Sequence, residues 1–140
     1  SSTGFLTCNN ISFIEYADYL IKLIVGPEIL SGSTRLKSGT ATKMVLNMIT
    51  TTTMMKLNHT FGNIMIDLLP KNQKLIKRAI HIITKELSVN KQEAKKLYQA
   101  SGNNLKVAIL MGKKRVSSDE AQKILSKHKG SLSRSLNEDG

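Results

Sequence analysis

Only two short runs of this 140-residue chain read as β-strands, and this scarcity limits the folds that it can adopt. The first run covers residues 3–8 and the second covers residues 19–25, where Gly26 and Pro27 end it. Two strands do not form a stable sheet alone, and neither is followed by a complete βαβ unit. We therefore expect the strands to be the edge of a larger sheet and helices to dominate the rest. Aromatic residues make up only 4% of the chain, which suits a helical core of aliphatic and Met side chains.

A helical pattern of apolar residues begins after Ser33 and continues to Leu57. Either Ser33 or Thr34 can serve as its N-cap, because a hydroxyl oxygen accepts a free backbone N–H group at a helix start. The pattern predicts a long and largely buried helix, with a possible break near Gly39. The β-branched run 50–53 has a poor helix propensity, so tertiary packing would have to hold it.

The second half of the sequence predicts shorter helices. Residues 61–63 read as a turn, and an amphipathic pattern predicts a helix between Pro70 and Leu87. Capping residues at Asn90 and Ser117 and the apolar spacing beyond them predict three more helices. Three glycines are placed to end helices, namely Gly102, Gly112 and Gly130. The expected organisation is an α/β part over residues 1–69, a connecting helix over 70–87, a small all-α three-helix domain over 88–136 and a disordered tail over 137–140.

The net charge of +11 lies almost wholly in the second half of the chain. Residues 1–69 carry five Lys or Arg against four acids, whereas residues 70–140 carry sixteen against six. Such a surface can attract nucleic acid, an anionic surface or a phosphorylated substrate. The charges are scattered among helical polar positions, and no stacking aromatic accompanies the basic cluster 113–115. A solvated helix surface therefore explains them better, and nucleic acid is not the expected partner.

Cysteine and histidine usage excludes several kinds of site. Cys8 is the only cysteine, so an internal disulfide is impossible and a reducing compartment, the cytoplasm, is the simpler expectation. The histidines share no metal-ligand spacing with one another or with Cys8; they are His59, His81 and His128. No apolar run approaches the roughly 20 residues of a membrane-spanning helix. We expect no metal, no cofactor and no membrane association.

The densest group of chemically useful residues lies between Gly26 and Thr40. Gly32 permits unusual backbone geometry just before the predicted helix start, where free backbone N–H groups favour an anion. Five residues there are candidates for binding a sugar phosphate: Glu28, Ser33, Thr34, Arg35 and Lys37. The hydroxyls and cations suit a phosphate, and Glu28 suits a sugar hydroxyl or proton transfer. A merely well-capped helix explains the same pattern about equally well.

The segment from Gly26 to Lys43 resembles the signature shared by bacterial N-acetylmuramic acid 6-phosphate etherases and the glucokinase regulatory protein. Three parts carry the likeness: Gly26-Pro27-Glu28, the run Gly32-Ser33-Thr34-Arg35-Leu36-Lys37-Ser38-Gly39-Thr40, and Lys43. It continues through residues 46–48 and 61–67 and covers about residues 6–136. The resemblance therefore identifies the chain as similar to the C-terminal half of these proteins.

The resemblance implies the end of a sugar isomerase (SIS) domain, an α/β sandwich that binds phosphosugars, followed by a small helical domain. Residues 102–109 are also similar to the second-helix region of ubiquitin-associated domains, which shared three-helix packing explains. Etherases of this family work as homodimers. They eliminate D-lactate from N-acetylmuramic acid 6-phosphate and add water, giving N-acetylglucosamine 6-phosphate in cell-wall recycling.

The chain departs from the family in one respect. The phosphate loop and catalytic glutamates of the etherases lie upstream of anything that matches it, so the resemblance assigns no catalytic residue here. We expect the chain alone to be inactive, with apolar surface that lowers its solubility or attracts a completing partner. Two functions stay open: part of a carbon–oxygen lyase, or part of a phosphosugar-binding regulator that performs no reaction, like the glucokinase regulatory protein.

Overall fold

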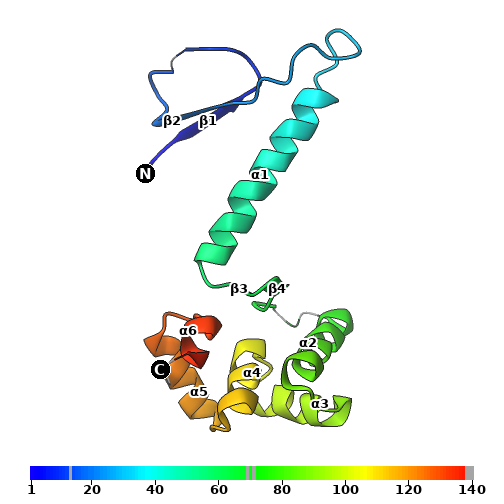
Figure 1. Ribbon diagram of the computed structural model, residues 1–140, viewed down its shortest axis with the longest axis vertical. Helices are drawn as coiled ribbons and strands as arrows, with labels where there is room; N and C mark the ends of the chain where they lie inside the picture. The colour runs from blue at the N-terminus through cyan, green and yellow to red at the C-terminus, as the bar shows by residue number, and fades with distance from the viewer. Residues whose placement is uncertain (13, 69, 71, 138–140) are drawn as a thin grey trace. The chain divides into compact units, whose positions relative to one another are not determined.

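The computed structural model describes residues 1–12, 14–68, 70 and 72–137 and shows a chain that is mostly helical where it is described (Figure 1). Two compact units are present, Ser1–Thr53 and Met54–Gly140. The helical content of the described residues confirms the prediction that helices dominate. The SIS-type sandwich and the boundaries at residues 69, 87 and 136 stay predictions. Of the predicted tail, residues 138–140 lie outside the described residues.

The first unit contains a parallel pair of short strands, β1 (Gly4–Thr7) and β2 (Tyr19–Lys22). Both strands were predicted, although β2 ends at Lys22, three residues before the predicted end at residue 25. The residues just before the two strands are hydrogen-bonded to each other. The Asp18 carboxylate, before β2, accepts the backbone N–H of Thr3, before β1, at 2.6 Å and the Thr3 hydroxyl at 3.1 Å. The pair spans only four residues a strand, and that it forms the edge of a larger sheet stays a prediction.

The long helix α1 (Lys37–Lys56) differs from its prediction in two respects. It begins at Lys37, not at Ser33 or Thr34, and it runs through Gly39 without a break. The β-branched run near its end is tolerated because the Thr50 and Thr53 hydroxyls each donate to a backbone carbonyl one turn earlier, both at 2.8 Å. These bonds satisfy the hydroxyls without tertiary partners.

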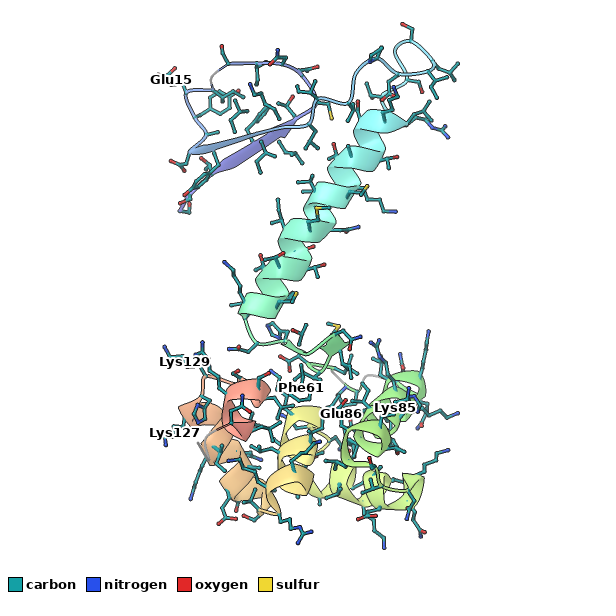
Figure 2. All side chains as sticks on the ribbon, viewed as in Figure 1. Glu15, Phe61, Lys85, Glu86, Lys127 and Lys129 are labelled. Carbon is teal, nitrogen blue, oxygen red and sulfur yellow. The ribbon has the colours of Figure 1, made fainter. Side chains whose placement is uncertain are left out.

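The predicted burial of α1 is wrong for this chain. Within the described structure no residue of α1 is buried, although four near its start are half-buried: Ser38, Ala41, Thr42 and Val45 (Figure 2). Two strands of four residues cannot cover a helix of 20 residues. The exposed apolar side chains lie at positions spread around the helix, the pattern of a helix that other elements normally enclose. They are Met44, Leu46, Met48, Ile49, Met54 and Met55.

The second unit begins with an antiparallel hairpin of β3 (Thr60–Phe61) and β4 (Ile64–Met65). Gly62, with φ of 56°, makes the turn between them, as the sequence predicted. Ile66 follows the hairpin and is 1% exposed. Phe61 and Ile64 of the hairpin therefore pack on the helical core that comes after it, whereas Met65 is exposed.

Five helices complete this unit: α2 (Gln73–Leu87), α3 (Lys91–Ala100), α4 (Leu105–Lys114), α5 (Ser118–Lys127) and α6 (Leu132–Leu136). Polar N-caps start them, and the predicted caps at Asn90 and Ser117 are confirmed, the latter as a full capping box with Glu120. Three helices were predicted after residue 88, but residues 88–137, the described part of this segment, form four. The fourth, α6, has only five residues, too few for a periodic pattern to reveal.

The core of the second unit is centred on α4, which contacts α2, α3, α5 and α6. Four consecutive residues, 107–110, are at most 2% exposed, so this helix is enclosed on all sides. Gly102 and Gly130 end helices in the left-handed conformation, as predicted. Gly112 does not; it lies inside α4, and Arg115, with φ of 56°, caps that helix instead.

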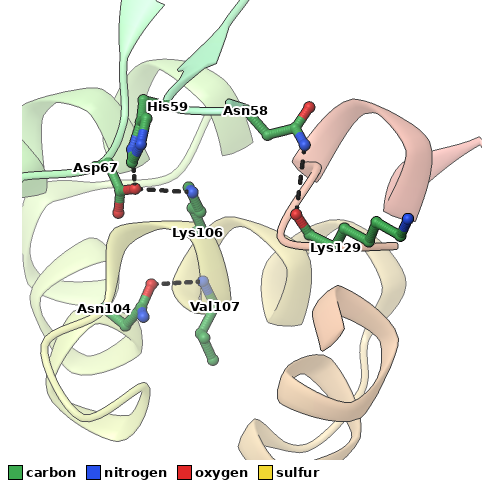
Figure 3. A network of polar contacts seen from close by, with 7 residues as sticks. All are labelled: Asn58, His59, Asp67, Asn104, Lys106, Val107 and Lys129. Carbon is green, nitrogen blue, oxygen red and sulfur yellow. Dashed lines mark hydrogen bonds and ion pairs between the residues drawn. The ribbon is translucent and has the colours of Figure 1, made fainter. Parts of the chain in front are cut away.

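A polar network ties the hairpin segment to the helices (Figure 3). Asp67 pairs with the ring of His59 and with the Lys106 ammonium, the latter at 3.1 Å. The Lys106 side chain is only 11% exposed, so this ion pair is shielded on one side. Asn58 adds a second tie by donating to the Lys129 carbonyl at 3.3 Å. Together these bonds hold residues 58–67 to α4 and to the loop before α6.

Asp67 should make the stability of this unit fall in acid. Burial alone would raise the pKa of Asp67, but the hydrogen bond and charge of Lys106, then those of His59, outweigh burial and hold it below 3.8. A lowered pKa in the folded state stabilises the protein above pH 3.8, and this stabilisation is lost as the pH falls through the lower value.

The variants Asp67→Asn and Lys106→Met should both flatten this acid dependence. At neutral pH the Asp67→Asn variant should lose about 1 kcal/mol or less, because the carboxylate is 42% exposed. Urea unfolding at a series of pH values measures the effect. An unchanged pH profile in both variants would show that the network contributes nothing to stability.

Candidate functional site

The segment between β2 and α1 is a tight loop shaped by two glycines. Gly26 and Gly32 have φ of 70° and 81°, values that residues with a Cβ rarely adopt. A turn closes where the Ser33 N–H donates to the Leu30 carbonyl at 3.0 Å. All five residues that the sequence nominated lie on residues 28–37 of this loop and the start of α1.

Glu28 crosses this loop to the first turn of α1. Its carboxylate accepts the Lys37 N–H at 2.8 Å on one oxygen and the Ser38 N–H at 2.9 Å on the other. The Lys37 ammonium returns to the Pro27 carbonyl at 2.8 Å. Among the nominated residues, the structure therefore brings Glu28 and Lys37 together.

These hydrogen bonds fix the charge of Glu28. The N–H groups of Ser38 and Lys37 hold its pKa below the ordinary value of 4.5. The group is thus a carboxylate at neutral pH, and both oxygens already accept a hydrogen bond. A general base or acid needs the opposite, a pKa raised towards neutrality. This geometry makes Glu28 a poor candidate for proton transfer.

The sequence predicted that the hydroxyl of Ser33 or Thr34 caps α1. This prediction is wrong. The helix starts at Lys37, and the Glu28 carboxylate takes the capping role. Thr34 contributes its backbone carbonyl, which accepts the Gly39 N–H at 2.9 Å. Ser33 is half-buried, whereas Thr34 and Arg35 are exposed at the surface of the loop. In the described part of the chain Arg35 forms no ion pair.

An open depression of about 570 Å³ lies beside this loop. Its lining is mostly apolar and includes Lys37 as its one charged residue. The lining residues are Val25, Leu36, Lys37, Thr40, Ala41 and Met44. A ligand there would contact the first two turns of α1 and the end of the loop.

Sequence reasoning missed one contact near the site. The Cys8 thiol lies 3.7 Å from the Ser38 carbonyl and 3.7 Å from the Thr42 hydroxyl. The segment after β1 is thereby held against the first turns of α1. No local pattern could reveal a pair separated by 30 residues.

We also searched the described residues for a metal site and for a membrane-spanning helix. Among the described residues, no three His, Cys, Asp or Glu side chains lie close enough to hold a metal ion. Within the same residues, no helix has the length and apolar content to cross a membrane.

Comparison with known proteins identifies the relatives of this chain. A protein of Staphylococcus epidermidis named N-acetylmuramic acid 6-phosphate etherase is 44% identical over 138 residues, 98% of this chain. The match covers 47% of that protein and falls in its C-terminal part. The chain is homologous to the C-terminal part of N-acetylmuramic acid 6-phosphate etherases. The family resemblance stated from the signature residues is thereby confirmed.

Etherases from two other bacteria give the same result. The protein of that name from Clostridium beijerinckii is 44% identical over 134 residues, and the one from Trichodesmium erythraeum is 43% identical over 133 residues. These matches cover 44% and 43% of the two proteins. The chain thus spans less than half the length of the etherases that it matches. No family model matches the chain.

Proposed function

We propose that this chain is the C-terminal part of an N-acetylmuramic acid 6-phosphate etherase. The observation that carries the proposal is the 44% identity to a protein of that name over 98% of the chain. The reaction would cleave the lactyl ether of the sugar phosphate, giving N-acetylglucosamine 6-phosphate and D-lactate in cell-wall recycling. None of the three relatives described above is named as a regulator, so the lyase is preferred to the regulatory alternative.

The contribution of this chain would be to bind the sugar phosphate. Arg35 is exposed, and a guanidinium can hold two phosphate oxygens at once. The Ser33 and Thr34 hydroxyls lie beside it in sequence and can donate to the same group. Lys37 adds charge at the rim of the depression, and Glu28 supports the loop. The acid and base of the elimination would come from residues outside this chain. No metal or cofactor is proposed.

The whole protein is proposed to be a cytoplasmic homodimer. The cytoplasmic assignment rests on the single Cys8 and on the substrate, a sugar phosphate of intracellular recycling. The dimer rests on the family resemblance. The exposed apolar side chains of α1 are surface that a completed fold or a second subunit would cover.

Release of D-lactate from N-acetylmuramic acid 6-phosphate tests the proposal. The assay compares this chain with a longer protein that extends it upstream to the full length of its relatives. Release by the longer protein alone is the expected result. If neither protein releases D-lactate while N-acetylglucosamine 6-phosphate still binds the longer one, the regulatory function replaces the lyase.

The Arg35→Ala variant of the longer protein should bind N-acetylglucosamine 6-phosphate about tenfold to a hundredfold more weakly. The reason is that a hydrogen bond to a charged group contributes about 1.5–3 kcal/mol, and 1.4 kcal/mol is about tenfold in affinity. Its thermal stability should stay unchanged, because Arg35 is exposed and forms no ion pair among the described residues. Calorimetric titration measures the affinity. Unaltered binding would show that Arg35 does not contact the sugar phosphate, and Arg78→Ala, a change at an exposed arginine of α2, is the matched control.

A further inference from the structure

The first three residues of α1, Lys37, Ser38 and Gly39, have no free backbone N–H group to offer a ligand. A helix leaves its first four N–H groups without intrahelical acceptors, and these groups form the usual anion site. In α1 three of them belong to Lys37, Ser38 and Gly39. Glu28 accepts the first two and the Thr34 carbonyl accepts the third at 2.9 Å, whereas the Thr40 N–H makes the first helical bond, to the Leu36 carbonyl at 3.1 Å.

We propose that Glu28 is a positioning residue, an internal anion that occupies the N-terminus of α1 in place of the substrate phosphate. The inference rests on the proposed function, and it deepens the account of that site. The two carboxylate oxygens each accept one N–H, at 2.8 and 2.9 Å, which is how a bound phosphate would use the same groups. A phosphate could bind there only by displacing a carboxylate of the same chain.

The position of Glu28 also shapes the loop that carries the other candidates. The carboxylate joins residue 28 to residues 37 and 38, and the Lys37 ammonium joins the helix back to the Pro27 carbonyl at 2.8 Å. The residues between these two points form a closed loop that includes Ser33, Thr34 and Arg35. The Lys37 and Ser38 amides are therefore not open to the sugar phosphate, and the groups of this segment left to contact it are Arg35 and the two hydroxyls.

The first test follows the amides of Lys37 and Ser38 by NMR while the 140-residue chain is titrated with acid. Both amide signals should move together with the carboxyl carbon of Glu28, at a midpoint below pH 4.5, because protonation weakens both hydrogen bonds. The Glu15→Ala variant, which changes an exposed glutamate of the same unit, should show the same titration. The proposal would be overturned if the Lys37 and Ser38 amide signals did not shift at the pH at which the Glu28 carboxyl carbon titrates.

The second test adds inorganic phosphate at neutral pH. The Lys37 and Ser38 amides of the unaltered chain and of Glu15→Ala should not shift, because Glu28 fills the position. In Glu28→Ala the same amides should shift in a saturable manner, because the vacated N–H groups are then free to bind the anion. Phosphate-dependent shifts of these amides in the unaltered chain would show that Glu28 does not exclude an anion and would overturn the proposal. Insensitivity of the Lys37 and Ser38 amides to phosphate in Glu28→Ala would also overturn the proposal, because it would show that the N-terminus of α1 is not an anion site.

These tests do not depend on catalysis, so their failure differs from a failure of the proposed function. If the longer protein released no D-lactate, the proposed lyase function would be wrong, but the proposed role of Glu28 would be unaffected. If the Lys37 and Ser38 amides titrated independently of Glu28, the proposed role of Glu28 would be wrong, but the proposed lyase function would be unaffected.

Discussion

The Ile109→Ala variant should lose about 2–5 kcal/mol of unfolding free energy in the second unit. Ile109 is 0% exposed and lies in α4, the helix that contacts all four other helices of this unit. The substitution removes buried apolar surface and also leaves a cavity, because neighbours enclosed on every side relax only in part. This is the largest stability effect that we expect from a single change.

A graded series makes that expectation specific to packing. Ile109→Val removes one methylene and should cost about 0.5–1.5 kcal/mol. Lys113→Ala, at an exposed position of the same helix, should stay within about 0.5 kcal/mol of the unaltered protein. Urea unfolding followed through NMR signals of the second unit measures all three. Similar losses for Ile109→Ala and Lys113→Ala would show that α4 is not the packed centre of the unit.

The sequence predicted those parts of the fold whose causes are local. The Asn90 and Ser117 caps, the turn at Gly62 and the helix ends at Gly102 and Gly130 each depend on residues within one turn of the chain. Such signals can be read from spacing because the hydrogen bonds that they form are short in sequence. The two strands were found for the same reason, through short apolar runs that end at turn residues.

The wrong predictions involve partners that are distant in sequence. Ser33 and Thr34 had the residue types of an N-cap, but Glu28 reaches the first turn from nine residues upstream of Lys37. The burial of α1 was inferred from its apolar residues, yet burial depends on elements that would enclose the helix. The described part of the chain supplies only two short strands beside it. Local pattern can reveal that a helix is apolar, but not what covers it.

The candidate site was predicted in part. The five residues share one loop, as their spacing in the sequence requires, and their role in binding a sugar phosphate stays a prediction. The separate roles of these residues could not be predicted. Residue type alone does not distinguish a carboxylate that binds substrate from one that caps a helix. The two hydrogen bonds of Glu28 make that distinction.

Gly112 gives the second large effect, and it reverses the role that the sequence suggested. A Cβ built at this position of α4 collides with a methyl group of Leu87, the last residue of α2, and lies 3.0 Å from the other methyl and 3.1 Å from Cγ. The glycine is present because two helices approach closely, not because a helix ends. Gly112→Ala should therefore cost about 1–3 kcal/mol from overpacking, reduced by up to about 1 kcal/mol of gained helix propensity.

A double-mutant cycle with Leu87 separates these two contributions. In the Leu87→Ala background the collision is absent, so Gly112→Ala should no longer destabilise the unit and should stabilise it by up to about 1 kcal/mol, the difference in helix propensity. The same urea unfolding experiment, applied to the two single variants and the double variant, measures the coupling. An equal loss from Gly112→Ala in both backgrounds would mean that Leu87 is not the obstacle. A change of sign would establish that the packing of α2 against α4, rather than helix termination, requires glycine at this position.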